Sequence, residues 1–111
     1  MFKTEVEVRD DARIFAGSDP AHTAMGAVYF EGAVPALTPL MLEATQGVLV
    51  PWDGTHAGQA VAVLALDHDG VSGLGSYYKS GTFDIDKIVW PESVTATLKR
   101  NAFIGTAISV A

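Results

Sequence analysis

The longest apolar run of the chain is Ala60-Val61-Ala62-Val63-Leu64-Ala65-Leu66. Turn signals bound it on both sides, Asp53-Gly54 before the run and Asp67-His68-Asp69-Gly70 after it. A short run without polar alternation, set between turns, is typical of a strand that is buried on both faces. We therefore predict a buried strand from Gly58 to Leu66. The run is far shorter than the roughly 20 residues that a membrane-spanning helix needs, so no membrane partner is expected.

Further strands are predicted on both sides of this run. Leu40-Met41-Leu42 and Val48-Leu49-Val50 flank a loop that contains Gly47, which favours a hairpin. The alternative is a single helical turn with Pro39 at its first position. The remaining predicted strands are a short one in Ala27-Val28-Tyr29-Phe30, one from Ser76 to Phe83, and a last one from Ala102 to Val110. Asp84 to Trp90 is predicted to be a short helical or extended connection.

One helix is predicted, from Ser93 to Asn101. Ser93 is a suitable N-cap, and Lys99 and Arg100 occupy the last turn, where cations interact favourably with the helix dipole. The chain of 111 residues has the length of one domain. The predicted fold is mainly β, a compact single domain with long loops and one short helix.

Charge and composition limit the partners. The net charge is −6, from 13 acidic and 7 basic residues, which argues against direct binding of nucleic acid. There is no cysteine, so disulfides are excluded and folding in a reducing cytoplasm is compatible with the sequence. The chain has 11 glycines and only 9% aromatic residues, which suggests a marginal monomer core that gains stability from burial against copies of itself.

The N-terminal segment, residues 1–17, is predicted to be a flexible arm, and residues 18–111 form the body. Val6 and Val8 alternate with charged neighbours, a period-2 pattern that is compatible with a strand. The pattern is too short and too charged to anchor itself in a core. Its first residues lack the apolar stretch of a signal peptide.

Four groups of residues raise the question of catalysis, metal binding or phosphate binding. Asp67-His68-Asp69 offers metal ligands, but Gly70 follows it and Asp is favoured in hairpin turns, so we predict a turn. Ser18 and Asp19 lie near His22, yet no nucleophile elbow surrounds a serine, and Ser80-Gly81 is interpreted as a bend or bulge. Gly73-Leu74-Gly75 lacks the lysine and helix of a phosphate loop. We predict no catalytic residues, no metal and no cofactor.

Each of the two tryptophans, Trp52 and Trp90, lies beside a proline and close to an acidic residue. We predict that each is a half-buried anchor whose indole N–H finds a carbonyl group. The anchor either packs within the subunit or contributes to a subunit contact, and the two roles are compatible because Trp is enriched at the centres of interfaces.

Six short segments, in order and with similar spacing, closely resemble the head decoration protein D family of lambda-like bacteriophages. The resemblance runs from about Ser18 to the C-terminus and fades before it. The segments are Ser18-Asp19-Pro20-Ala21-His22-Thr23-Ala24, Pro35-Ala36-Leu37-Thr38-Pro39-Leu40-Met41-Leu42, Trp52-Asp53-Gly54-Thr55, Tyr78-Lys79-Ser80-Gly81-Thr82-Phe83, Trp90-Pro91-Glu92 and Ala102-Phe103-Ile104-Gly105-Thr106-Ala107-Ile108-Ser109.

The resemblance implies a fold of the β-clip kind and a trimer that binds at local threefold positions of the expanded phage head. That trimer would stabilise the shell against internal DNA pressure. The implied partners are the major capsid protein and two further copies of the chain. The implied location is the outer capsid surface, after assembly in the host cytoplasm. The residues expected to bind the capsid are Thr4, Val6, Val8, Ser18, Asp19, Pro20 and His22.

Two other functions are weighed against this one. The first is a small β-rich hydrolase or metal-dependent domain that uses His22, His56 and His68. The second is an adhesion or carbohydrate-binding module that presents Tyr29, Tyr77 and Tyr78, although these tyrosines alternate with core-like residues. An assay for activity or metal content separates the first from the decoration function, which expects an inert protein.

Overall fold

The strand predicted from the long apolar run is present as β4 (Ala60–Leu64), in the middle of a five-stranded sheet. The computed structural model describes residues 14–17 and 20–111. The order of the sheet is β1-β5-β4-β2-β3, and neighbouring strands are antiparallel. The other strands of the sheet are β1 (Thr23–Ala27), β2 (Pro39–Glu43), β3 (Val48–Pro51) and β5 (Leu74–Tyr78). The fold is mainly β, as predicted.

β4 separates two hydrophobic cores. Val63 packs into the larger core, and Leu64 packs into the smaller one. The pairing of β2 with β4 shifts register between Leu40 and Met41, and Val61, 37% exposed, lies at this irregularity. A bulge of this kind changes which face the following residues occupy. The larger core contains Trp52, Ala60, Val63, Phe83, Ile88, Ala102, Phe103 and Ile108, and the smaller core contains Val28, Phe30, Leu40, Leu49, Ala62 and Leu64.

The two outer strands of the five-stranded sheet meet. Val28, which follows β1, forms an isolated parallel bridge with Leu49 of β3, and the Tyr29 N–H donates to the Leu49 carbonyl at 3.0 Å. The sheet therefore curls around the smaller core. The prediction of a strand from Ala27 to Phe30 is wrong. The regular strand here is β1, which ends at Ala27.

The predicted hairpin is confirmed, because β2 and β3 pair in register from Leu40↔Pro51 to Glu43↔Val48. β2 begins at Pro39, so the alternative of a helical turn at this proline is wrong. Proline fits here because the first residue of a strand tolerates the missing N–H group.

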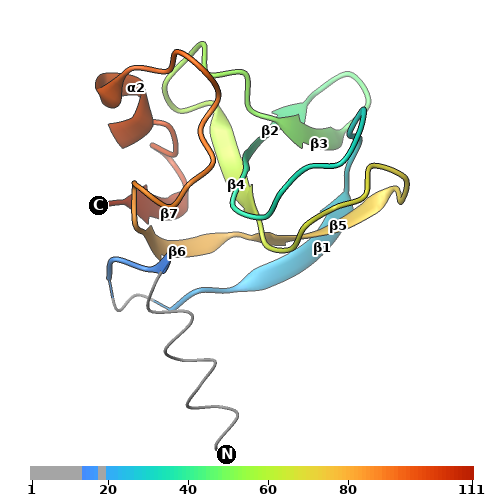
Figure 1. Cartoon of the computed structure of the whole chain (residues 1–111), viewed down its shortest axis with the longest axis horizontal. Helices are drawn as coiled ribbons and strands as arrows, with labels where there is room; N and C mark the ends of the chain where they lie inside the picture. Colours follow the sequence, from blue (N-terminus) through green and yellow to red (C-terminus); the bar gives the residue numbers. More distant parts are fainter. Residues whose placement is uncertain (1–13, 18–19) are drawn as a thin grey trace, which may run out of the picture.

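The strand predicted from Ser76 to Phe83 is two strands in two sheets. β5 ends at Tyr78, and β6 (Ser80–Phe83) starts after Lys79 and pairs in parallel with β7 (Ala107–Val110). Figure 1 shows β6 and β7 side by side near the C-terminus, while β1 and β5 form a long ribbon that leads away from them. The last strand starts five residues later than predicted because residues 101–106 form turns.

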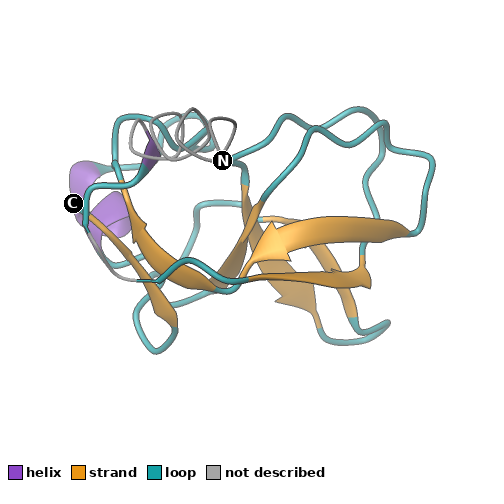
Figure 2. Ribbon diagram, turned by 90° about the horizontal axis from the view of Figure 1, so that it is seen from below, coloured by secondary structure: helices purple, strands orange, loops and turns teal. Residues whose placement is uncertain are grey.

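The helix is shorter than predicted. It is α2 (Ala96–Arg100), and its N-cap is Thr95, whose side chain accepts a hydrogen bond from the Leu98 N–H. Ser93, the predicted N-cap, has φ of +65° and lies in a turn instead. Lys99 and Arg100 occupy the last turn as predicted. Figure 2 shows the helix at the same end of the molecule as the C-terminus. Among residues 14–17 and 20–111, no helix has the length and apolar character to cross a bilayer.

Candidate functional site: the root of the N-terminal segment

Residues 14–16, at the end of the predicted arm, are attached to the body beside β6. The Ala16 N–H donates to the Thr82 carbonyl at 2.9 Å, and the Asp84 N–H donates to the Ile14 carbonyl at 2.6 Å. Phe15 forms an antiparallel bridge with Phe83. Because β7 occupies the other edge of β6, this isolated bridge and the two hydrogen bonds lie along the edge of β6 that β7 leaves open. We call residues 14–17 and 20–22 the root.

The second half of the root is fixed by one hydroxyl group. Ser80 Oγ accepts a hydrogen bond from the His22 N–H at 3.0 Å and donates to the Pro20 carbonyl at 3.1 Å. The Lys79 N–H donates to the His22 carbonyl at 2.8 Å. The chain therefore meets β6 twice, once before and once after positions 18–19.

An aromatic cluster packs under the first half of the root. The rings of Phe15, Tyr78 and Phe83 have centroid distances of 4.9 to 5.7 Å. Phe83 is fully buried in the larger core. Gly81 has φ of +125°, and a Cβ there would lie 3.3 Å from Ala21 Cβ and 3.6 Å from Phe15. Glycine thus suits both the backbone conformation and the close approach of the root.

Of the predicted capsid-binding residues, Pro20 and His22 lie in the root. Both side chains are exposed, and their backbone groups are the ones that bond to Ser80. Thr4, Val6, Val8, Ser18 and Asp19 lie outside the described residues, so their role in binding stays a prediction. The predicted arm, residues 1–17, includes Ile14 and Phe15, which the structure shows in contact with the body.

Both tryptophans belong to the packing around the larger core. Trp52 is 2% exposed, and its indole N–H donates to Gln59 Oε1 at 3.0 Å. The half-buried Trp90 donates to the Ile85 carbonyl at 2.8 Å, and the two rings meet edge to face at 6.1 Å. Each indole N–H thus reaches a carbonyl oxygen, as predicted, but Trp52 is fully buried where a half-buried anchor was predicted. A role of either residue between subunits stays a prediction.

His56 and His68 form hydrogen bonds with residues close to them in the sequence. His68 Nε2 lies 3.0 Å from the Leu74 carbonyl, and its Nδ1 accepts from the Gly70 N–H at 2.9 Å. His56 Nδ1 lies 2.9 Å from Thr55 Oγ1. These contacts hold turns. In the part of the chain that the structure describes, no group of three or more His, Asp or Glu side chains is placed to hold a metal ion. The alternative of a hydrolase or metal-dependent domain gains no support from this arrangement.

Two aspartates have their charged form stabilised by turn hydrogen bonds. The Thr55 hydroxyl and N–H both donate to Asp53, and this lowers the pKa of the Asp53 carboxyl. The N–H groups of Val71 and Ser72 donate to Asp69 and lower its pKa. Asp69 therefore closes the predicted turn after His68.

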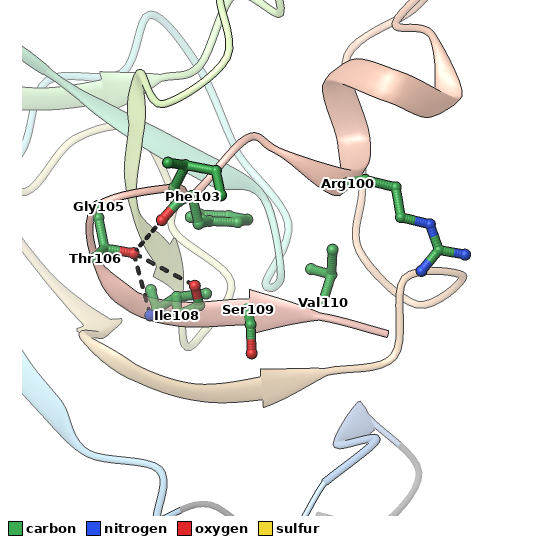
Figure 3. A pocket seen from close by; sticks show the side chains of 8 residues that line it. Arg100, Phe103, Gly105, Thr106, Ile108, Ser109 and Val110 are labelled. Atoms are coloured by element: carbon green, nitrogen blue, oxygen red, sulfur yellow. Dashed lines mark hydrogen bonds between the residues drawn. The ribbon is translucent and has the colours of Figure 1, made fainter.

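A hollow of about 240 Å³ lies beside β7 and α2. Figure 3 shows the Thr106 hydroxyl at one end of it, bonded to the Phe103 carbonyl at 2.7 Å and to the Ile108 N–H at 3.1 Å, while Arg100 extends away from it. The threonine hydroxyl thus links the turn at Phe103 to the start of β7.

The fold and the root together describe a small β-rich domain whose residues 14–16 are attached beside β6. The sequence model of the family "Bacteriophage lambda head decoration protein D" matches residues 4–110. The chain is 53% identical over 107 residues to the head decoration protein of Enterobacteria phage P21, covering 96% of this chain and 93% of that protein. It is 50% identical over 105 residues to the putative decoration protein of Escherichia phage N15, covering 94% and 96%.

The chain therefore belongs to the head decoration protein D family and has a role in decorating the phage capsid. The family match begins at residue 4 and so includes most of the predicted arm, whereas the short segments of the sequence suggested that the resemblance fades before Ser18. Sequence reasoning also missed the root. Its signal was the apolar triplet Ile14-Phe15-Ala16, which follows Arg9-Asp10-Asp11.

Proposed function

We propose that three copies of the chain bind together at local threefold positions of the expanded head shell and reinforce it against the pressure of packaged DNA. The match to decoration proteins over residues 4–110 carries this proposal. The partner is the major capsid protein on the outer surface of the virion, and binding follows assembly in the host cytoplasm. The mechanism is binding without turnover, and it needs no cofactor.

The N-terminal segment supplies the route to the capsid. Thr4, Val6 and Val8 stand in a period-2 pattern, and an extended segment of this kind can add a strand to an exposed sheet edge of the partner. Three such segments in a trimer combine weak contacts through their effective concentration. A partner edge that forms only when the shell expands would restrict binding to late assembly.

The free chain has apolar surface that self-association would cover. Met25 and Leu74 are 64% and 58% exposed on neighbouring strands β1 and β5, and Leu42 of β2 is 54% exposed. Copies with a net charge of −6 repel each other at long range, so uncharged surface is where they approach most easily.

Co-sedimentation with empty heads of its own phage tests the proposal. The full chain should sediment with expanded heads and stay in the supernatant with unexpanded ones. A chain that lacks residues 1–13 should fold and lose most of this binding. Equal binding of the shortened and full chains would refute the role of the N-terminal segment. Binding to neither form of the head would refute the decoration of this shell.

A further inference from the structure

We propose that the root is a rigid anchor that positions the N-terminal segment for head binding, with Phe15 and Ser80 as its positioning residues. This inference rests on the proposed function, because it assumes that the segment before Ile14 contacts the capsid. Its own content is that the attached body of the protein begins at Ile14 and not after Gly17.

The first argument is that the two halves of the root are fixed independently to one strand. Residues 14–16 pair with Thr82, Phe83 and Asp84 through backbone contacts. The second half meets β6 at the Ser80 hydroxyl, which serves as both donor and acceptor. Positions 18–19 are therefore bracketed by attached chain on both sides.

The second argument is that the attachment reaches the larger core. Phe15 touches Phe83, whose ring is fully buried, and Tyr78, which packs against the same core. Replacing the Phe15 ring by a methyl group removes these contacts, whereas the backbone hydrogen bonds of Ile14 with Asp84 and of Ala16 with Thr82 remain possible. Hydrogen bonds of this type contribute about 1 kcal/mol each, comparable with the cost of ordering one residue of backbone.

A fixed root matters because it sets the length of the tether. With the root attached, five residues (9–13) lie between Val8 and Ile14, and with the root released fourteen residues (9–22) lie between Val8 and Thr23. Effective concentration falls roughly as the −3/2 power of tether length, about fivefold for each arm. Two of three arms in a trimer bind intramolecularly after the first, so release of the root should weaken head binding by at least about fivefold.

The test compares full-length variants on expanded empty heads. Phe15→Ala and Ser80→Ala are made singly and together, and Phe15→Leu restores apolar contact in place of the ring. Val28→Ala is the matched control, because Val28 is buried in the smaller core, away from the root. Deletion of residues 1–13 reports separately whether the N-terminal segment binds at all.

Mobility of the root is measured in the same variants. The chain contains no cysteine, so Ala16→Cys gives a single attachment point for a spin label on an exposed residue whose N–H bonds to Thr82. The label should be restricted in the otherwise unchanged chain and in the Val28→Ala background. It should become mobile in the Phe15→Ala, Ser80→Ala double variant.

The expected result is a mobile label together with head binding that is at least about fivefold weaker in the double variant, intermediate loss in each single variant, and recovery with Phe15→Leu. Unchanged head affinity despite a mobile label would overturn the inference, and so would a label that stays restricted. Equal loss in Val28→Ala would also overturn it, because the effect would then act through stability. If deletion of residues 1–13 leaves binding intact, the proposed function of the segment fails first.

Discussion

Gly70 is the position where one added methyl group should do the most damage. Its φ is +83°, and a Cβ there would lie 2.5 Å from both the carbonyl carbon and the oxygen of Gly32. These are backbone atoms that no side-chain rotation can move away. We therefore expect Gly70→Ala to force the loop at Gly32 apart from the turn after His68.

The size of the effect follows from three contributions. A left-handed backbone costs an alanine about 1 kcal/mol. Displacing Gly32 disturbs the neighbouring pair of hydrogen bonds between Val34 and His68, 2.8 and 2.9 Å long, each contributing about 1 kcal/mol. The sum is about 3 kcal/mol, which for a domain of this size lowers the melting temperature by about 12 °C.

Substitutions at two other glycines distinguish the cost of backbone strain from the cost of a steric clash. Gly47 has φ of +74° with nothing within 4 Å of an added Cβ, so Gly47→Ala should lose only the backbone contribution, about 1 kcal/mol. Gly73 also has open space and is not among the positive-φ glycines, so Gly73→Ala should be neutral or slightly stabilising. The assay is thermal unfolding followed by circular dichroism, at one protein concentration because self-association shifts the midpoint. Equal losses for Gly70→Ala and Gly47→Ala would refute the reasoning from Gly32.

Four further predictions concern the helix cap, acid stability, assembly, and the side chains of Asp19 and His22. Thr95→Ala should lower the free energy of unfolding by about 1 kcal/mol in urea denaturation, whereas Ser93→Ala should change it little. The lowered pKa values of Asp53 and Asp69 give stability that is complete above the unfolded pKa of about 3.9 and is lost as the pH falls through the lower folded values. Asp53→Asn should therefore flatten the loss of melting temperature below about pH 4, and an unchanged acid profile would contradict this assignment. Sedimentation should show a trimer, and the melting temperature should rise with protein concentration. A stable monomer at micromolar concentrations would contradict this prediction. Asp19→Ala and His22→Ala should weaken co-sedimentation with heads at nearly constant melting temperature if these side chains contact the capsid, and stability should fall first if they only hold the loop.

The elements that could be predicted are those whose signal is local. β4 was visible because Val63 and Leu64 face opposite cores, which requires apolar residues at successive positions. The hairpin of β2 and β3 was visible because short apolar runs flank a loop with Gly47. β1 was missed because Thr23–Ala27 consists mainly of small residues, and its place in the sheet depends on pairing with β5, about 50 residues away in sequence.

The division of one predicted strand into β5 and β6 has a similar cause. The run from Ser76 to Phe83 keeps a strand-like pattern across Lys79, but the partner strands differ on the two sides. The root escaped prediction because Ser80 and Phe15 are ordinary in sequence, and only the fold brings them to the same strand. Ser93 was predicted as the helix cap in place of Thr95 because both residue types suit an N-cap. Residues 92–93 form a turn, so the helix begins only after Thr95.

The position of β4 between the two cores has a consequence for how the molecule opens. Neither core can open without exposing one face of this strand to water. The two cores should therefore unfold as one cooperative unit. The slowest-exchanging amide protons should then belong to β4, and their exchange should report the global opening reaction. A shell component built in this way stays closed or opens completely under tension, with no half-open state in between.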